Sequence, residues 1–290
     1  MTDIPNNGIC KLRIKSVNMH LHSRYSDGAL KPKVIVETAI QNNLDLISIT
    51  DHDTVEAYNH IPVSHIPLRI LPGIEFSSTW EESDVHILGY GVDVNNKELL
   101  DVLNWMKNGR WHRALRMLDK LSRLGIKIPM ERVVTYAGDM NLIVRPHIAQ
   151  ALVADNHCRN KQEAFEKYIG NDAPAYEPKP VLSTADVIRF IHDAGGFAFV
   201  AHPGKLRKID FLQDFVPLGL DGVEVWHPDH NEALRRELEE FCQKNSLLQS
   251  AGSDFHGEED SNVYFGGVPA SEVILDNLQK MWDEFKCRMN

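Results

Sequence analysis

The sequence carries histidines and carboxylates in short alternating pairs, and the first pair is His20 and His22 in the segment NMHLHS. In a β-strand, residues two positions apart point to the same side, so these two imidazoles would lie close together. Two neighbouring imidazoles suit the binding of one divalent ion. Asp27 follows in SRYSDGA, beside the end of the same expected strand. Asp27 is equally compatible with an ordinary turn carboxylate before Gly28.

Two further clusters follow apolar runs in the first hundred residues. His52 lies in TDHD, directly after the run LDLISI, where it could bind a metal while Asp53 caps the next helix. Glu75 lies in the run RILPGIEF, where an unpaired buried carboxylate would be costly and a bridge between two cations would satisfy it. His86 in DVHILGY is compatible with a ligand or with a hydrogen-bonded core histidine.

The second half of the sequence repeats this arrangement. His202 in AHPG and His227 in VWHPD each follow an apolar run. Asp254 and His256 in SDFH form another alternating pair, with both side chains on one face of an expected strand. Each feature is modest alone, but their common position after apolar runs indicates one shared site.

The elements expected to position these residues alternate between apolar runs and segments of helical periodicity. Strands are expected at residues 17–22, 44–50, 69–78, 85–93, 196–204, 221–229 and 247–256. Repeated β–α units imply a largely parallel sheet, and about seven strands favour a closed barrel over an open doubly wound sheet. In parallel α/β barrels the carboxyl ends of the strands build the active site, where the clustered side chains fall.

A change of pattern interrupts this alternation. Residues 97–124 read as one long amphipathic helix, and shorter helices are expected at 130–138, 146–155 and 161–169. No strand is expected again before about residue 196, and the proline-rich segment 171–180 reads as an extended linker. The sequence therefore predicts a barrel formed by residues 1–99 and 179–290 and a helical insertion, a candidate substrate domain, at 100–178.

Arg145 and His147 lie in this insertion, on either side of a proline that starts a helix. An arginine beside free backbone N–H groups suits phosphate, although it is also compatible with an exposed surface position. A row of basic residues at helical spacing also lies here: Lys107, Arg110, Arg113, Arg116 and Lys120. Such rows are mostly solvated faces, and the alternative is a role in leading a nucleotide to the site.

Composition limits the classes of partner. The net charge of −10 argues against binding of long nucleic acid duplexes. No apolar run is long enough to span a bilayer, and the first residues lack a signal-peptide pattern, so a cytoplasmic protein without membrane contact is expected. The four cysteines are far apart and are expected to be reduced thiols. The remaining histidines are expected to be surface or structural: His60, His65, His112, His157, His192 and His230.

The ordered motifs HLHS, TDHD, GIE, AHPG and SDFH resemble those of the polymerase and histidinol phosphatase (PHP) family. The insertion with RPH resembles the branch that contains RNase AM-like enzymes and nucleoside 3',5'-bisphosphate phosphatases. The resemblance implies a distorted (β/α)7 barrel that binds two or three divalent ions. The ligands it implies are His20, His22, Asp27, His52, Glu75, His86, His202, Asp254 and His256.

The resemblance also implies residues that touch the substrate. Arg145 and His147 would hold phosphate, and His227 would contact phosphate or donate a proton. Lys205 follows AHPG, where many relatives have arginine, and a lysine can still meet phosphate as a point charge. Ser23 and Tyr25, beside the first histidine pair, are further expected substrate contacts.

The mixed histidine and carboxylate set suits Mn, Fe or Zn. The expected reaction is attack of a metal-bridging hydroxide on the 3'-phosphate of nucleoside 3',5'-bisphosphates, and on short oligonucleotides from 5' to 3'. One alternative is a phosphatase for a small non-nucleotide ester such as histidinol phosphate. The other is a non-catalytic metal-binding module.

Overall fold

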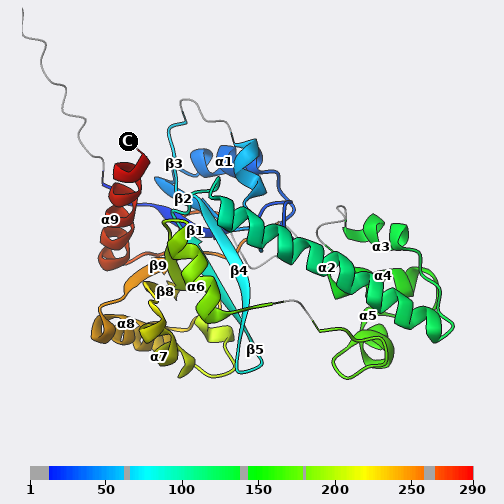
Figure 1. Cartoon of the computed structure of the whole chain (residues 1–290). Helices are drawn as coiled ribbons and strands as arrows, with labels where there is room; N and C mark the ends of the chain where they lie inside the picture. Colours follow the sequence, from blue (N-terminus) through cyan, green and yellow to red (C-terminus); the bar gives the residue numbers. More distant parts are fainter. Residues whose placement is uncertain (1–12, 62–65, 138–142, 179–180, 258–264, 290) are drawn as a thin grey trace, which may run out of the picture.

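The computed structural model describes residues 13–61, 66–137, 143–178, 181–257 and 265–289, which form a mixed α/β protein (Figure 1). A parallel three-stranded sheet has the order β1-β2-β3. Its strands are β1 (Val17–Leu21), β2 (Leu46–Ile49) and β3 (Arg69–Ile70). The first two strands are fully buried, including the polar Asn18, His20 and Ser48.

A six-stranded sheet has the order β6-β4-β5-β7-β8-β9. Its strands are β4 (Gly73–Trp80), β5 (Ser83–Tyr90), β6 (Leu182–Ser183), β7 (Phe197–Val200), β8 (Gly222–Trp226) and β9 (Leu248–Ala251). The prediction of one strand over 69–78 is wrong. The chain leaves the first sheet after β3 and enters the second sheet at β4. Pro72 lies between the two strands and cannot donate a backbone hydrogen bond. The short strand β6 was not expected.

The strands pair mostly in parallel, as expected, and β5 is the exception. β5 is antiparallel to both of its neighbours, β4 and β7. Glu81 and Glu82 connect β4 to β5 with positive φ angles of 46° and 61°, the backbone of a tight two-residue hairpin. Such turns usually contain glycine or asparagine, so two glutamates gave no sign of a hairpin.

Two isolated bridges connect the two sheets, beside the carboxyl ends of β1, β2 and β9. Leu21 of β1 pairs with Phe255, after β9, and His52, after β2, pairs with Glu75 of β4. Backbone hydrogen bonds support both bridges: His22 N donates to Phe255 O at 2.9 Å, and Glu75 N donates to Asp51 O at 3.2 Å. The bridges bring the motif HLHS beside SDFH, and TDHD beside GIE.

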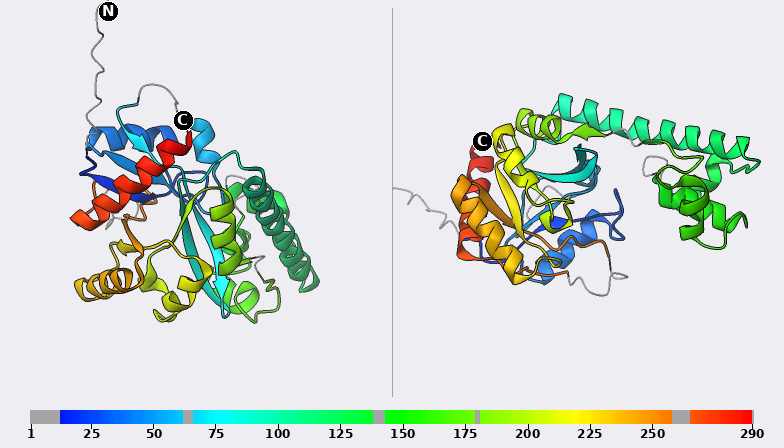
Figure 2. Two further views of the ribbon diagram at one scale, coloured as in Figure 1. Left: turned by 60° about the vertical axis from the view of Figure 1, so that its left-hand side comes forward. Right: turned by 90° about the horizontal axis from the view of Figure 1, so that it is seen from below.

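Helices surround the sheets (Figures 1 and 2). They are α1 (Pro32–Gln41), α6 (Thr184–Asp193), α7 (Phe211–Phe215), α8 (Glu232–Asn245) and α9 (Glu272–Met289), with short turns η1 (Glu56–His60), η3 (Pro203–Lys205) and η4 (Val216–Leu218). Ser183 caps α6 by accepting from Asp186 N, as the sequence predicts. Helix α9, which packs beside β9, was not expected. No described helix combines the length and apolar character needed to cross a membrane.

Helix α2 (Lys97–Arg123) extends away from the sheets and carries the remaining helices at its far end (Figures 1 and 2). These are α3 (Met130–Ala137), α4 (Arg145–Ala154), α5 (Lys161–Ala164) and the π-helical turn η2 (Phe165–Ile169). Leu99 and Leu103, early in α2, pack into the core of the sheets, whereas Met117 and Leu121 pack into a separate core of the insertion. The expected boundary at residue 100 therefore falls within a helix that belongs to both parts.

Candidate metal centre

Glu75 lies at the centre of the clustered side chains. It is the third residue of β4 and its side chain is fully buried. Its two oxygens lie 2.7–3.3 Å from ring nitrogens of five histidines: His20, His22, His52, His86 and His202. A buried carboxylate surrounded by imidazoles has the form of a bridge between metal ions.

Asp254 supplies a second carboxylate, directly after β9. One oxygen lies 3.3 Å from His20 Nε2 and 3.1 Å from His22 Nε2. The other lies 2.9 Å from Lys205 Nζ and 3.4 Å from His227 Nε2. Asp254 therefore connects the histidine cluster to two residues expected to meet substrate.

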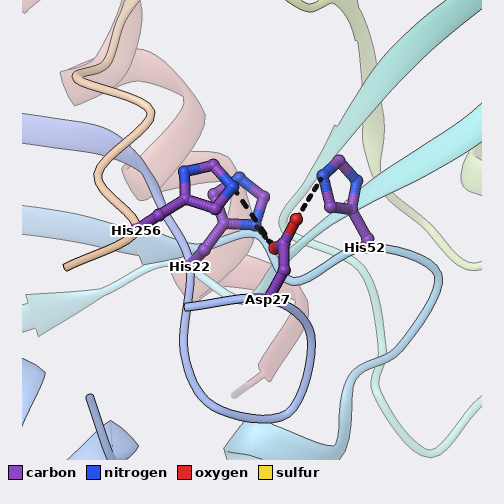
Figure 3. A group of neighbouring side chains, drawn as sticks. All are labelled: His22, Asp27, His52 and His256. Atoms are coloured by element: carbon purple, nitrogen blue, oxygen red, sulfur yellow. Dashed lines mark ion pairs between the residues drawn. The ribbon is translucent and has the colours of Figure 1, made fainter. Parts of the chain in front are cut away.

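Asp27 supplies a third carboxylate from the loop after β1 (Figure 3). Its oxygens lie 3.2 Å from His256 Nε2 and 3.6 Å from His52 Nε2. Figure 3 shows Asp27 between these two rings, with His22 stacked on His256 at a centroid distance of 4.1 Å. This arrangement unites the loop after β1, the end of β2 and the segment after β9.

The structure thus brings together all nine residues expected as ligands. Eight of them form three overlapping groups in which the ligand atoms lie within 4.8 Å of one another. The groups are His22, Asp27, His52 and His256; His20, His22, Glu75 and Asp254; and His52, Glu75 and His86. The ninth, His202, lies 2.9 Å from Glu75. Their role as ligands stays a prediction.

The chemistry of these groups fits divalent ions. Among the described residues, His22 Nε2 and His52 Nδ1 are buried polar atoms that lie 3.1–3.3 Å from carboxylate oxygens without hydrogen-bond geometry, and a cation bound beside them would satisfy both. Burial lowers the pKa of His52 to about 4, which keeps this ring neutral, as a ligand must be. Burial favours the neutral form of Glu75, yet the histidines around it hold its pKa well below the ordinary value. Burial disfavours a charge on His20 and His22, yet the carboxylates around them raise the pKa of both rings, to about 10 for His22, so a bound cation would take the place of their protons.

A cavity of about 440 Å³ opens beside this centre. Asp27, His52 and His86 line it from the sheets, and Arg110 and His147 line it from the insertion. Val144 N donates to His147 Nδ1 at 3.3 Å, so the other ring nitrogen of His147 carries its proton. Of the two insertion residues expected to hold phosphate, His147 thus lines the cavity.

Arg145 lies elsewhere. Its Nη1 donates to Asn171 Oδ1 at 2.8 Å, and its guanidinium lies over the rings of Phe165 and Tyr176 at 5.6 and 5.5 Å. Arg145 is not among the residues that line the cavity. In this structure Arg145 contacts residues of its own insertion, and its expected phosphate contact stays a prediction.

The basic row on α2 is also mostly engaged, which corrects its interpretation as a solvated face. The side chain of Arg110 is 11% exposed and contacts Asp53. Arg113 is buried and donates to the backbone oxygen of Glu177, whose carboxylate pairs with Arg116 and Lys120. Arg110 therefore lies beside the candidate centre, and a role for it at the site stays a prediction.

Comparison with known proteins identifies the family. A family model described as PHP domain matches residues 18–169. The chain belongs to the PHP family. It is 30% identical to a 5'-3' exoribonuclease of Haemophilus influenzae, over 93% of this chain and 99% of the relative. It is 29% identical to a 3',5'-nucleoside bisphosphate phosphatase of Chromobacterium violaceum, over 94% of this chain and 98% of the relative.

A solved structure supports the same assignment. An amidohydrolase from Chromobacterium violaceum, with bound sulfate and no metal, aligns with a TM-score of 0.76 at 28% identity, covering 94% of this chain and 97% of that chain. The PHP resemblance predicted from the five motifs is thus confirmed. The family match ends before His202 and Asp254, so the fold is what brings these residues to the PHP motifs of the first half.

Two further buried carboxylates of this PHP protein lie beside the expected ligands: Glu224, which was not predicted from the sequence, and Asp51 of the motif TDHD. Glu224 in β8 accepts from His20 Nδ1 at 2.9 Å and from His202 N at 2.7 Å. Asp51 accepts from Ser23 N and Ser23 Oγ, both at 2.6 Å. Each follows or interrupts an apolar run, which is the signal that singled out Glu75. Both orient residues of the centre.

The remaining expected contacts occupy several environments. Ser23 is fully buried and its hydroxyl donates to Asp51, and its expected substrate contact stays a prediction. Tyr25 is half-buried and stacks on His60 at 4.8 Å. Asp229 N donates to His227 Nδ1 at 3.1 Å, so His227 Nε2 carries a proton toward Asp254. His230 is structural, as predicted, because both of its ring nitrogens bond to backbone. His65 lies outside the described residues.

Proposed function

We propose that this PHP protein is a metal-dependent phosphoesterase that removes the 3'-phosphate from nucleoside 3',5'-bisphosphates and shortens RNA from its 5' end. The observation that carries the proposal is the gathering of nine histidine and carboxylate side chains around the buried Glu75. The names of the two relatives, a bisphosphate phosphatase and a 5'-3' exoribonuclease, support the substrate class.

We further propose that the strands close into a distorted seven-stranded barrel. The parallel bridges Leu21 to Phe255 and His52 to Glu75 support closure, because they link β1 to β9 and β2 to β4. The ring would then run through β1, β2, β4, β5, β7, β8 and β9. This closure would explain why the centre lies at the carboxyl ends of the parallel strands.

Two or three divalent ions would be held by the three groups around His22, Glu75 and His86. The mixed nitrogen and oxygen ligands favour Mn, Fe or Zn. When bound, such ions activate water and neutralise charge on phosphate oxygens. His20 is held for this role by Glu224, and Glu75 can serve two ions because each of its oxygens already faces different histidines.

The chain's own groups would position phosphate and supply the proton. Arg110 and His147 line the cavity beside the centre, where they would face phosphate oxygens. Water adds to phosphorus, and the bond between phosphorus and the 3' oxygen of the ribose breaks. The 3' oxygen that leaves needs a proton. The ring N–H groups of His147 and His227 are the two candidate donors. The ammonium group of Lys205 contacts the Asp254 carboxylate at the edge of the centre.

One bond unites the two proposed activities. In a nucleoside 3',5'-bisphosphate the phosphate on the 3' oxygen is terminal, whereas in RNA the same phosphate also carries the next nucleoside. Cleavage between the 3' oxygen and phosphorus releases phosphate in the first case and a 5'-phosphorylated shorter strand in the second. A single centre can therefore catalyse both.

The test is phosphate release from adenosine 3',5'-bisphosphate by manganese-loaded protein, compared with release from histidinol phosphate. We expect the nucleotide to be the better substrate, and Asp254→Ala to release phosphate far more slowly than the parent. Faster hydrolysis of histidinol phosphate would favour the small-ester alternative. Failure to hydrolyse any phosphoester would favour the non-catalytic metal-binding alternative.

A further inference from the structure

A second cavity continues from the one beside the metal centre. It measures about 720 Å³ and lies between the loop after β2 and the first half of α2. The two cavities share five lining residues: Arg24, His52, Asp53, Arg110 and Ala137. The volume is in the range of sites that hold small ligands. We call this second cavity the α2 groove.

One face of α2 forms a wall of the α2 groove. The lining residues of this helix are Leu100, Leu103, Asn104, Lys107 and Arg110. Their spacing of three or four residues places them in a single row along the helix. The row begins with a half-exposed Leu100 and ends with Arg110 at the metal centre. A ligand that lies along this row would therefore reach the centre with one end.

The charges in the α2 groove leave cations free. Its lining holds two carboxylates, Asp53 and Glu56, of which Asp53 contacts Arg110, against three cations, Arg24, Lys107 and Arg110. Within the described ranges, neither Lys107 nor Arg24 has a carboxylate at ion-pair distance, and the Arg24 guanidinium lies 5.6 Å from the centre of the Tyr25 ring. The uncompensated charge of the groove is thus positive, in a chain whose net charge is −10.

The other lining groups suit a nucleoside. Three asparagines, Asn59, Asn95 and Asn104, contribute amides that can donate and accept hydrogen bonds. Leu100, with 37% of its surface exposed, offers an apolar face against which a base can pack. Unpaired cations, amides and an apolar face in one row match the alternating phosphate, base and sugar of a single strand.

We propose that the α2 groove binds the RNA strand on the 3' side of the bond that is cleaved. The proposal rests on the proposed function, because the reacting phosphate must lie at the metal centre. A bridging phosphate in RNA carries one nucleoside on each side. The centre is flanked by two cavities, so each cavity can take one of the two sides. The cavity beside His147 takes the 5'-terminal nucleotide, and the α2 groove takes the strand that follows, with Lys107 against its next phosphate.

The experiment compares adenosine 3',5'-bisphosphate, which does not enter the groove, with the 5'-phosphorylated trinucleotide pApApA. Because an exposed ion pair contributes little, Lys107→Ala should lower kcat/KM for the first cleavage of pApApA about fivefold. Lys107→Glu should lower it further, and both variants should hydrolyse the bisphosphate at the parent's rate. Lys97→Glu, an exposed lysine of α2 outside the groove, is the matched control.

A second variant tests the groove by its volume. Asn104→Trp should block the trinucleotide while leaving bisphosphate hydrolysis unchanged. If parent protein hydrolyses neither compound, the proposed function itself fails. If parent protein hydrolyses only the bisphosphate, or if the Lys107 and Asn104 variants keep the parent's ratio between the two substrates, the groove does not bind the strand.

Discussion

Glu224 Oε1 lies 2.9 Å from His20 Nδ1, and both side chains are fully buried beneath the candidate metal centre. Glu224 also accepts from His202 N, so one carboxylate fixes two expected ligands. A hydrogen bond of this kind sets which nitrogen of the imidazole faces the metal and strengthens it as a ligand. Glu224 is therefore a positioning residue of the centre.

Replacing Glu224 by glutamine should weaken metal binding while the protein remains folded. A glutamine amide can still accept from one partner, but its uncharged oxygen holds the imidazole less firmly. We expect divalent-ion affinity to fall about tenfold to a hundredfold. Competition against a metal-binding dye measures the affinity directly. Glu239→Gln, on the exposed surface of α8, should bind ions like the parent; equal affinities for both variants would remove Glu224 from the centre.

Adding manganese should stabilise the metal-free protein. His22 Nε2 and His52 Nδ1 have no hydrogen-bond partner among the described residues, and a bound ion would satisfy them. At a hundredfold excess over the dissociation constant, we expect the melting temperature to rise by about 5 °C. Differential scanning calorimetry before and after chelation measures this shift. His22→Ala should reduce the shift, whereas His192→Ala, at the end of α6 where it pairs with Asp221 rather than with a residue of the centre, should keep it; no shift in the parent would argue against a metal centre.

Removing Arg110 should destabilise the protein and slow catalysis. Asp53 is buried and contacts the Arg110 guanidinium, so Arg110→Ala would leave a carboxylate without its cation. Loss of one partner of a buried pair costs about 3 kcal/mol. Urea unfolding of Arg110→Ala and of Arg123→Ala, which breaks an exposed pair with Asp119, provides the comparison. The Arg123 variant should lose less than about 1 kcal/mol; equal losses would mean that the Arg110 contact adds nothing.

The metal centre was predictable because its residues carry a strong local signal. His20 and His22, or Asp254 and His256, alternate on expected strands, and a strand places alternate side chains on one side. The order of the motifs then identified the family. Glu224 carries the same signal as Glu75, a carboxylate inside an apolar run, but it was not singled out. Nothing in its sequence neighbourhood separates a ligand from the residue that orients one.

The contacts between the two parts of the chain could not be predicted from sequence. Arg145 and Arg110 both read as basic residues on helices, yet the first lies between Phe165 and Tyr176 and the second reaches Asp53 at the centre. Which of them meets the cavity depends on how α2 leaves the sheets. The antiparallel strand β5 was missed for a local reason, since its Glu81–Glu82 turn lacks the residues that usually adopt positive φ.

The central claim is that Glu75 organises metal ions that hydrolyse a phosphoester. The most direct measurement is the rate of phosphate release from adenosine 3',5'-bisphosphate by manganese-loaded Glu75→Gln, with Asp119→Asn as the exposed control. We expect Glu75→Gln to lose activity by at least about a hundredfold, as loss of a bridging ligand requires, and the control to match the parent. A Glu75→Gln variant that binds manganese and hydrolyses the bisphosphate at the parent's rate would contradict the account.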